Sequence, residues 1–161
     1  MSVNTTGQDY LSMAIEIATQ NVHNAGGPFG AIVVTPDGQV FEGVNRVTAS
    51  NDPSAHAEVV AIRTAAAALE NFDLSGCVLY TSCEPCPMCL ATSLWARISK
   101  VCYAADRHDA AKAGFDDAVF YEYFEANSDR ALMPVQHFDN DAVEHLKPFE
   151  AWDALETRTD Y

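Results

Sequence analysis

The residues best suited to chemistry are three evenly spaced cysteines, with a histidine and a glutamate upstream of them. Residues 81–97 read TSCEPCPMCLATSLWAR, so Cys83, Cys86 and Cys89 stand three residues apart. Cysteines at positions i and i+3 lie on one face of a helix, where both sulfurs can bind one metal ion about 2.3 Å away. The upstream segment HAE supplies His56 and Glu58. Together these residues predict a metal site.

Zinc and an iron–sulfur cluster are the two metal centres that such cysteines could hold. A cluster needs four ligands, so the run of three would require Cys77 or Cys102 as the fourth. Both of these lie in apolar segments, where a buried free cysteine is the ordinary case, and a cluster would leave the histidine without a role. We therefore predict one Zn²⁺ per chain, with His56, Cys86 and Cys89 as its ligands and the first cysteine of the run outside the ligand set.

Three protein ligands leave the fourth position of a tetrahedral zinc ion to water, which is typical of catalytic zinc sites. Zinc lowers the pKa of such a water toward about 7. Glu58 lies two residues after a ligand and is not a ligand itself, so we predict that it carries the proton of that water. A closed, non-catalytic zinc module is the alternative from another functional class, and it would give Glu58 no role.

The two motifs are predicted to stand at the starts of two helices. One helix is expected to begin at Pro53 or Ser54 and the other at Pro85 or Pro87, the second running to about residue 97. Helix N-termini favour negative charge, which lowers thiol pKa values and supplies the thiolates that zinc binds. His56 lies three residues before an apolar stripe, so its ring is expected to point inward.

Apolar periodicity predicts alternating helices and strands in the rest of the chain. Further helices are expected at residues 6–23, 115–123 and 141–155, and strands at residues 31–35, 39–45, 77–81, 100–104 and 135–138. The turn Pro36-Asp37-Gly38 makes the first two strands a predicted hairpin. Strands separated by helices imply crossover connections and a partly parallel sheet that is covered on both faces.

Composition limits the class of protein and the kind of partner. The 161 residues fit one domain, residues 1–161, and no apolar run approaches the length of about 20 residues that a membrane helix needs. The start MSVNTTGQDY lacks the features of a secretory signal, and five clustered cysteines suit reduced thiols, so we expect a cytoplasmic protein. The net charge of −14 disfavours nucleic-acid and membrane partners and favours a small, weakly charged substrate.

Several segments resemble a known enzyme family. His56-Ala57-Glu58 followed by PCPMC fits the H-x-E…P-C-x-x-C signature of zinc nucleobase deaminases, and the chain resembles the cytidine and nucleobase deaminase superfamily. Within it, GGPFGAIVV, GVNRV, NDPSAHAEVVAIR, LYTSCEPCPMC, AGFDDAVFY and EHLKPFEAW resemble the small bacterial guanine deaminases. The zinc motifs alone would fit other base deaminases equally well; residues 114–117 and the C-terminal tail narrow the resemblance.

The resemblance implies a reaction, a fold and an assembly. The reaction is zinc-dependent hydrolysis of guanine to xanthine and ammonia in purine breakdown, by attack of zinc-bound hydroxide on C2 with Glu58 as proton shuttle. The fold is a three-layer α/β/α, cytidine-deaminase-like sandwich with a five-stranded mixed sheet. The assembly is a homodimer in which a C-terminal segment, from about residue 140 to residue 161, is exchanged between the two chains.

The resemblance also assigns roles around the zinc ion. Asp117 would lie beside the scissile amine as a second catalytic proton carrier, with Asp116 as an open alternative. Successive side chains on a helix diverge by about 100°, so only one of the two is expected to face the cavity. A second acid suits guanine, because the site must donate a proton to N3 and release ammonia. The substrate-binding residues would be Asn45, which bonds the purine, Phe29 and Trp95, which pack around it, and Tyr161, which closes the cavity.

Other base deaminases remain alternatives at this stage. A tRNA adenosine deaminase is the nearest rival, because its zinc motifs are nearly interchangeable with these, but a chain of charge −14 is poorly suited to an RNA backbone. Deaminases of cytosine, cytidine, aminotriazines or other aminopurines also stay open.

Overall fold

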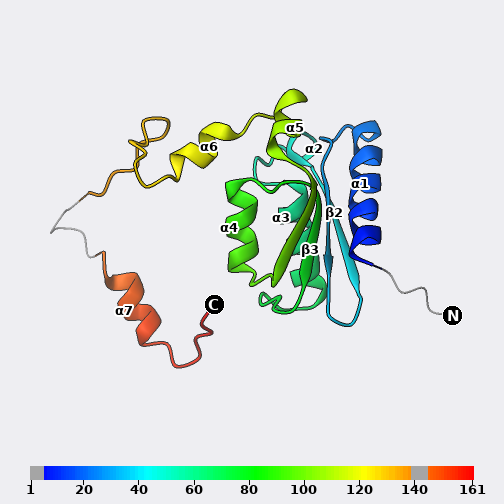
Figure 1. Cartoon of the computed structure of the whole chain (residues 1–161). Helices are drawn as coiled ribbons and strands as arrows, with labels where there is room; N and C mark the ends of the chain where they lie inside the picture. Colours follow the sequence, from blue (N-terminus) through cyan, green and yellow to red (C-terminus); the bar gives the residue numbers. More distant parts are fainter. Residues whose placement is uncertain (1–5, 139–144) are drawn as a thin grey trace. The chain divides into compact units, whose positions relative to one another are not determined.

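The computed structural model describes residues 6–138 and 145–161 (Figure 1). The chain divides into two compact units, Met1–Glu122 and Tyr123–Tyr161. The first unit contains the sheet and both predicted zinc motifs. The second contains helix α7 (Lys147–Asp153). Among the described residues, no helix combines the length and the apolar character that crossing a membrane requires.

The sheet of the first unit is mixed, with strand order β2-β1-β3-β4. Its strands are β1 (Gly30–Val34), β2 (Val40–Val44), β3 (Val78–Cys83) and β4 (Lys100–Ala105). β1 pairs antiparallel with β2 and with β3, and β3 pairs parallel with β4. The predicted hairpin and the partly parallel sheet are therefore confirmed.

The expectation of five strands is wrong for the residues that the structure describes, which form four. The missing strand was expected at residues 135–138, and these residues are in no regular element. A β-strand forms only where a second strand accepts and donates its backbone hydrogen bonds. Apolar alternation alone therefore does not make a strand of this segment, in which Val135 is 67% and Phe138 79% exposed in the single chain.

Helices cover both faces of the sheet and give the first unit three layers. Helix α1 (Gly7–His23) lies on one face, and α3 (Ala57–Ala68) and α4 (Pro87–Trp95) lie on the other (Figure 1). Every residue of β1 is buried, because this inner strand is covered on both sides. Thr6 caps α1, in a capping box with Asp9. The α/β architecture inferred from the sequence is confirmed.

A glycine sets the distance between α3 and the sheet. A Cβ atom on Gly43 of β2 would lie 2.3 Å from the carbonyl oxygen of Ala57 and 2.3 Å from the amide nitrogen of Ala61. Only a residue without a side chain lets the first turns of α3 approach the strand this closely. Since α3 begins immediately after His56, this contact helps to place the predicted zinc ligand.

Several helix boundaries differ from the prediction. α3 begins at Ala57, not at Pro53 or Ser54, because Asp52 accepts hydrogen bonds from the amide and hydroxyl groups of Ser54 and holds this stretch in a turn. Two short helices were not predicted, α2 (Val47–Ser50) and α5 (Arg107–Lys112). The helix expected at residues 115–123 is α6 (Ala118–Tyr123). The helix expected at residues 141–155 is observed as α7, and residues 141–144 lie outside the described residues.

Candidate active site

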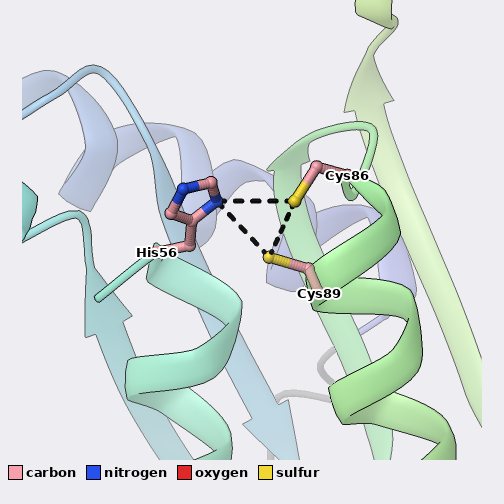
Figure 2. Close-up of side chains that lie close together, drawn as sticks. All are labelled: His56, Cys86 and Cys89. Atoms are coloured by element: carbon pink, nitrogen blue, oxygen red, sulfur yellow. Dashed lines mark hydrogen bonds between the residues drawn. The ribbon is translucent and has the colours of Figure 1, made fainter. Parts of the chain in front are cut away.

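The three predicted zinc ligands meet at the N-terminal ends of α3 and α4 (Figure 2). The Nδ1 atom of His56 lies 3.6 Å from Cys86 Sγ and 3.6 Å from Cys89 Sγ, and the two sulfurs lie 3.6 Å apart. Zinc–ligand bonds of about 2.0–2.3 Å at tetrahedral angles require separations of roughly 3.5–3.8 Å. The three atoms therefore fit a tetrahedral zinc ion without rearrangement.

Local backbone geometry directs the ligands toward one another. His56 and Cys86 are the N-cap residues of their helices, both with extended backbones. The side chains therefore project beyond the helix ends, where backbone N–H groups favour a negative charge. Cys89 lies three residues after Cys86, in the first turn of α4, and is fully buried. Its sulfur is the third of the three ligand atoms.

The two ligand thiols have different proton affinities. Hydrogen bonding from Cys89, and then from His56, lowers the pKa of Cys86 to about 4. The same contact with Cys86, together with burial, raises the pKa of Cys89. The contact with Cys86 also raises the pKa of His56. Zinc binds thiolates and neutral imidazole, so metal binding at this site releases protons.

The glutamate that was predicted to carry the proton is buried beside the ligands. Glu58 lies in the first turn of α3 and is only 6% exposed. Burial is the main cause that raises its pKa, and the neighbouring Cys86 charge acts in the same direction. A raised pKa brings a carboxyl group closer to the neutral range, which favours its use in general acid–base catalysis.

A cavity of about 470 Å³ opens next to this site, within the first unit. This volume lies in the usual range for small-molecule sites. Its lining includes six of the nine predicted site residues: Phe29, Asn45, His56, Glu58, Cys86 and Asp117. Cys89 lies behind Cys86 and is completely buried. The remaining two, Trp95 and Tyr161, lie outside this lining and are 67% and 72% exposed in the single chain.

Asp116 and Asp117 differ in what their carboxylates contact. Asp116 accepts a hydrogen bond from the amide of Ala118, the first residue of α6, in a local turn. Asp117 is more buried than its neighbour, and burial and the Cys86 charge raise its pKa. Both residues line the cavity, but the environment of Asp117 is the one that suits a second proton carrier.

One wall of the cavity depends on Asn21, a residue that the sequence did not single out. Its Nδ2 atom donates to the carbonyl oxygens of Gly27 and Asn45, 2.9 Å away in each case. Asn21 is 3% exposed, and it continues the buried spacing of Ala14 and Ala18 on α1. Its position as a polar residue on a buried stripe was the sequence signal that could have identified Asn21. The side chain of Asn21 ties the end of α1 to the segment before β1 and to the end of β2.

Aromatic side chains form another part of the lining. The rings of Phe29 and Phe115 meet edge to face, with centroids 5.0 Å apart, and both line the cavity. Phe115 was not singled out in the sequence, because nothing local to it indicates a partner so far along the chain. An apolar aromatic pair is suited to the faces of a planar ring.

Cys83 lies near the ligands but outside their cluster, as predicted. Its sulfur contacts the carbonyl oxygen of Asp106 at 3.7 Å, and burial raises its pKa to about 11. In the part of the chain that the structure describes, the only group of three or more residues arranged to hold a metal ion is His56, Cys86 and Cys89. The geometry therefore favours zinc over an iron–sulfur cluster.

The chain is similar in sequence and structure to known deaminases. A family model described as the cytidine and deoxycytidylate deaminase zinc-binding region matches residues 4–105. Guanine deaminase of Bacillus subtilis (strain 168) is 44% identical over 155 residues, which cover 96% of this chain and 98% of that protein. An X-ray structure of guanine deaminase from Bacillus subtilis matches with a TM-score of 0.86 at 43% identity, covering 98% of this chain and 99% of that chain. The tRNA-specific adenosine deaminase of Buchnera aphidicola subsp. Schizaphis graminum is 32% identical over 111 residues, which cover 69% of this chain and 74% of that protein.

Proposed function

Because this chain belongs to the cytidine and deoxycytidylate deaminase family, we propose that it hydrolyses guanine to xanthine and ammonia. The observation that carries the substrate assignment is the extent of the match to the Bacillus subtilis guanine deaminase. The family model ends at residue 105, whereas that match covers 96% of the chain. It therefore includes residues 114–117, which contribute one wall of the cavity.

The chemistry starts from a water molecule next to Glu58. A zinc ion held by His56, Cys86 and Cys89 would supply a water of lowered pKa. Glu58 takes a proton from this water as its oxygen adds to C2 of guanine, and passes the proton to N3 of the ring. Glu58 would then take the proton of the new C2 hydroxyl group and deliver it to the amine, so that ammonia leaves as the C2 carbonyl forms. The buried position of Glu58 and its raised pKa support this shuttle.

The other lining residues would bind and orient the purine. Phe29 and Phe115 provide apolar ring faces, and Asn45 provides an amide whose Oδ1 atom already accepts the amide hydrogen of Val47. The Nδ2 group of Asn45 is then a donor for an acceptor atom of the purine. Asp117, with its pKa raised by burial, would assist the release of ammonia as the second acid of the site.

We also propose that the protein is a homodimer in which about residues 140–161 are exchanged and Tyr161 closes the cavity of the partner. The second unit supports this assembly through its exposed apolar side chains. In the single chain, Leu132, Met133 and Phe149 are between 59% and 66% exposed. Apolar side chains gathered in one short segment usually mark an interface. Trp95 lies outside the cavity lining of its own chain, so the role expected for it in the substrate site requires the second chain of the dimer.

Deamination of adenosine in tRNA is the alternative function that a comparison supports, because a tRNA-specific adenosine deaminase also matches about two thirds of the chain. An RNA substrate requires contacts with several phosphates, usually from lysine and arginine. The net charge of −14, from nine basic and 23 acidic residues, opposes this binding. Guanine is the better-supported substrate.

Ammonia release from a substrate panel tests the proposal. The zinc-loaded protein is incubated with guanine, adenine, cytosine, cytidine, guanosine, an aminotriazine and a tRNA anticodon stem. We expect guanine to give the highest kcat/KM. Glu58→Gln, which keeps the side-chain shape, should retain zinc and lose turnover by about 10²–10⁴-fold. Preferred turnover of the RNA or of a pyrimidine would reassign the substrate, and full activity of Glu58→Gln would place the proton carrier elsewhere.

A further inference from the structure

An ion pair beside the cavity has an unusual number of contacts. Arg107 donates to Glu84 Oε1 through Nε at 3.1 Å and through Nη2 at 2.6 Å, and its backbone amide donates to Glu84 Oε2 at 2.9 Å. Both residues line the cavity and both are partly buried. Charge-assisted hydrogen bonds of this geometry are stronger than an exposed ion pair.

The guanidinium of Arg107 also lies over an aromatic ring. Its central carbon is 3.6 Å from the centroid of the Tyr121 ring, a cation–π contact. The hydroxyl group of Tyr121 in turn donates to the carbonyl oxygen of Pro85 at 2.6 Å. Glu84, Arg107 and Tyr121 thus form a stack, in which the arginine is held by the carboxylate and by the ring.

The stack connects the two segments that carry the chemistry. Glu84 and Pro85 immediately precede the ligand Cys86, and Tyr121 lies in α6, the helix that directly follows Asp117. Arg107 is the first residue of α5 and reaches both segments. The hydrogen bonds with Arg107 lower the pKa of Glu84, so the pair stays ionised across the neutral range. The positive charge of Arg107 also acts on Asp117, because it offsets part of the rise in the Asp117 pKa that burial causes.

We propose that Arg107 is a positioning residue, which holds α6 and therefore Asp117 against the loop of Cys86 by its contacts with Glu84 and Tyr121. This inference rests on the proposed function, in which Asp117 assists the departure of ammonia. Lysine could not replace the arginine, because a compact ammonium group has neither the planar face for the ring nor the fork for the carboxylate.

A double-mutant cycle tests whether Arg107 acts through Asp117. Arg107→Lys, Asp117→Asn and the double variant are compared with the parent for kcat and KM on guanine, with zinc content measured for each. We expect Arg107→Lys to lower kcat by about tenfold to a hundredfold, as misplacement of a reacting group does, with KM little changed and zinc retained. In the Asp117→Asn background, the same substitution should have no further effect, because no acid is left to position.

Control variants separate positioning from general destabilisation. Lys112→Ala removes a more exposed ion pair, with Asp109, from the same helix and should leave kcat unchanged. Tyr121→Leu removes the ring but not the ion pair, and should also lower kcat. It serves as the test variant if Arg107→Lys does not fold. Losses that multiply in the double variant, an effect confined to KM, or full activity of Asp117→Asn would each overturn the proposal.

Hydrogen exchange gives a readout that does not depend on the substrate assignment. The amides of residues 115–121 should exchange faster in Arg107→Lys than in the parent, and should be unaffected in Lys112→Ala. If the parent fails to turn over guanine but this local change is seen, the function is wrong and the positioning contact is right. Unchanged exchange in these residues would overturn the positioning role itself.

Discussion

At the scale of single residues, Cys83 and Cys86 differ in chemistry although they stand three residues apart. Burial raises the pKa of Cys83 to about 11, so its thiol is protonated at neutral pH. Hydrogen bonds from Cys89 and His56 lower the pKa of Cys86 to about 4, so this side chain is a thiolate. Position decides which of the two can bind zinc: Cys86 Sγ lies 3.6 Å from Cys89 Sγ and from His56 Nδ1, whereas Cys83 Sγ contacts the carbonyl oxygen of Asp106.

Substituting each of these cysteines should therefore have a different effect on zinc content. Cys86→Ala should lose the ion, because only two ligand side chains remain, and should unfold at lower urea concentration because bound zinc joins α3 to α4. Cys83→Ala should keep one zinc per chain and lose only the packing of its sulfur. Elemental analysis of the purified variants checks both outcomes. Zinc loss in Cys83→Ala, or iron and sulfide in the parent, would contradict the ligand assignment.

Residues that act through short sequence spacing could be predicted, whereas those that act through long-range contacts could not. His56, Cys86 and Cys89 follow from two local motifs, and the structure brings the three together. Asn21 reaches Asn45 across 24 positions, and Arg107 reaches Glu84 across 23. No local pattern identifies such a partner, because it depends on which strands become neighbours in the sheet.

At the scale of elements, the position of α3 depends on its contact with β2. The helix presents the backbone of Ala57 and Ala61 to Gly43, and its first residues follow His56 and include Glu58. A displacement of the helix by the width of a methyl group would therefore move a zinc ligand and the proton carrier together. The stability of this contact and the activity of the site should change in parallel.

Gly43→Ala tests this coupling. The added Cβ would lie 2.3 Å from two backbone atoms of α3, so the helix must move away from the strand. Overpacking of this kind typically costs about 1–3 kcal/mol of unfolding free energy. We expect a comparable loss in urea denaturation of the zinc-loaded protein, and a fall in kcat of at least about tenfold.

Gly7→Ala is the matched control, because its Cβ would meet Tyr80 at an ordinary contact distance of 3.4 Å. This substitution lies in the first turn of α1 and should leave both stability and kcat nearly unchanged. If Gly43→Ala were as stable and as active as Gly7→Ala, close approach of α3 to β2 would not position the site.

Element types were more predictable than element boundaries. The apolar periods of α1, β1 and β3 depend only on which faces are buried, and these elements were identified correctly. The start of α3 depended instead on the side chain of Asp52, which holds Ser54 in a turn that competes with the helix. Residues 135–138 have a strand-like composition but pair with no strand among the described residues, which shows that pairing, not pattern, decides.

At the scale of the whole molecule, the second unit exposes more apolar surface than a stable free segment would. Phe149, Leu155 and Tyr161 are between 47% and 72% exposed in the single chain. A helix of seven residues is also too short to be stable without packing against another surface. Both features support the proposal that this segment is covered in a dimer.

Deleting residues 157–161 should leave the zinc content and the dimer intact but weaken guanine turnover. The tail ends at Tyr161, which we propose closes the cavity of the partner, so its removal leaves the cavity open to water. Sedimentation, elemental analysis and steady-state kinetics measure the three properties. As a control, Tyr161→Phe keeps the ring and should retain most of the activity. Turnover equal to that of the parent would show that the tail takes no part.

Heterodimers distinguish a tail that closes its own cavity from one that closes the partner's. The truncated chain and a full-length Glu58→Gln chain are co-expressed with different affinity tags, and the mixed dimer is isolated through both. In this dimer, the only cavity with Glu58 lies in the truncated chain, and the only tail belongs to the other chain. If tails are exchanged, the cavity with Glu58 is closed, and the mixed dimer should exceed either homodimer in turnover. If each tail serves its own chain, the cavity with Glu58 stays open, and the mixed dimer should show no gain over the truncated homodimer.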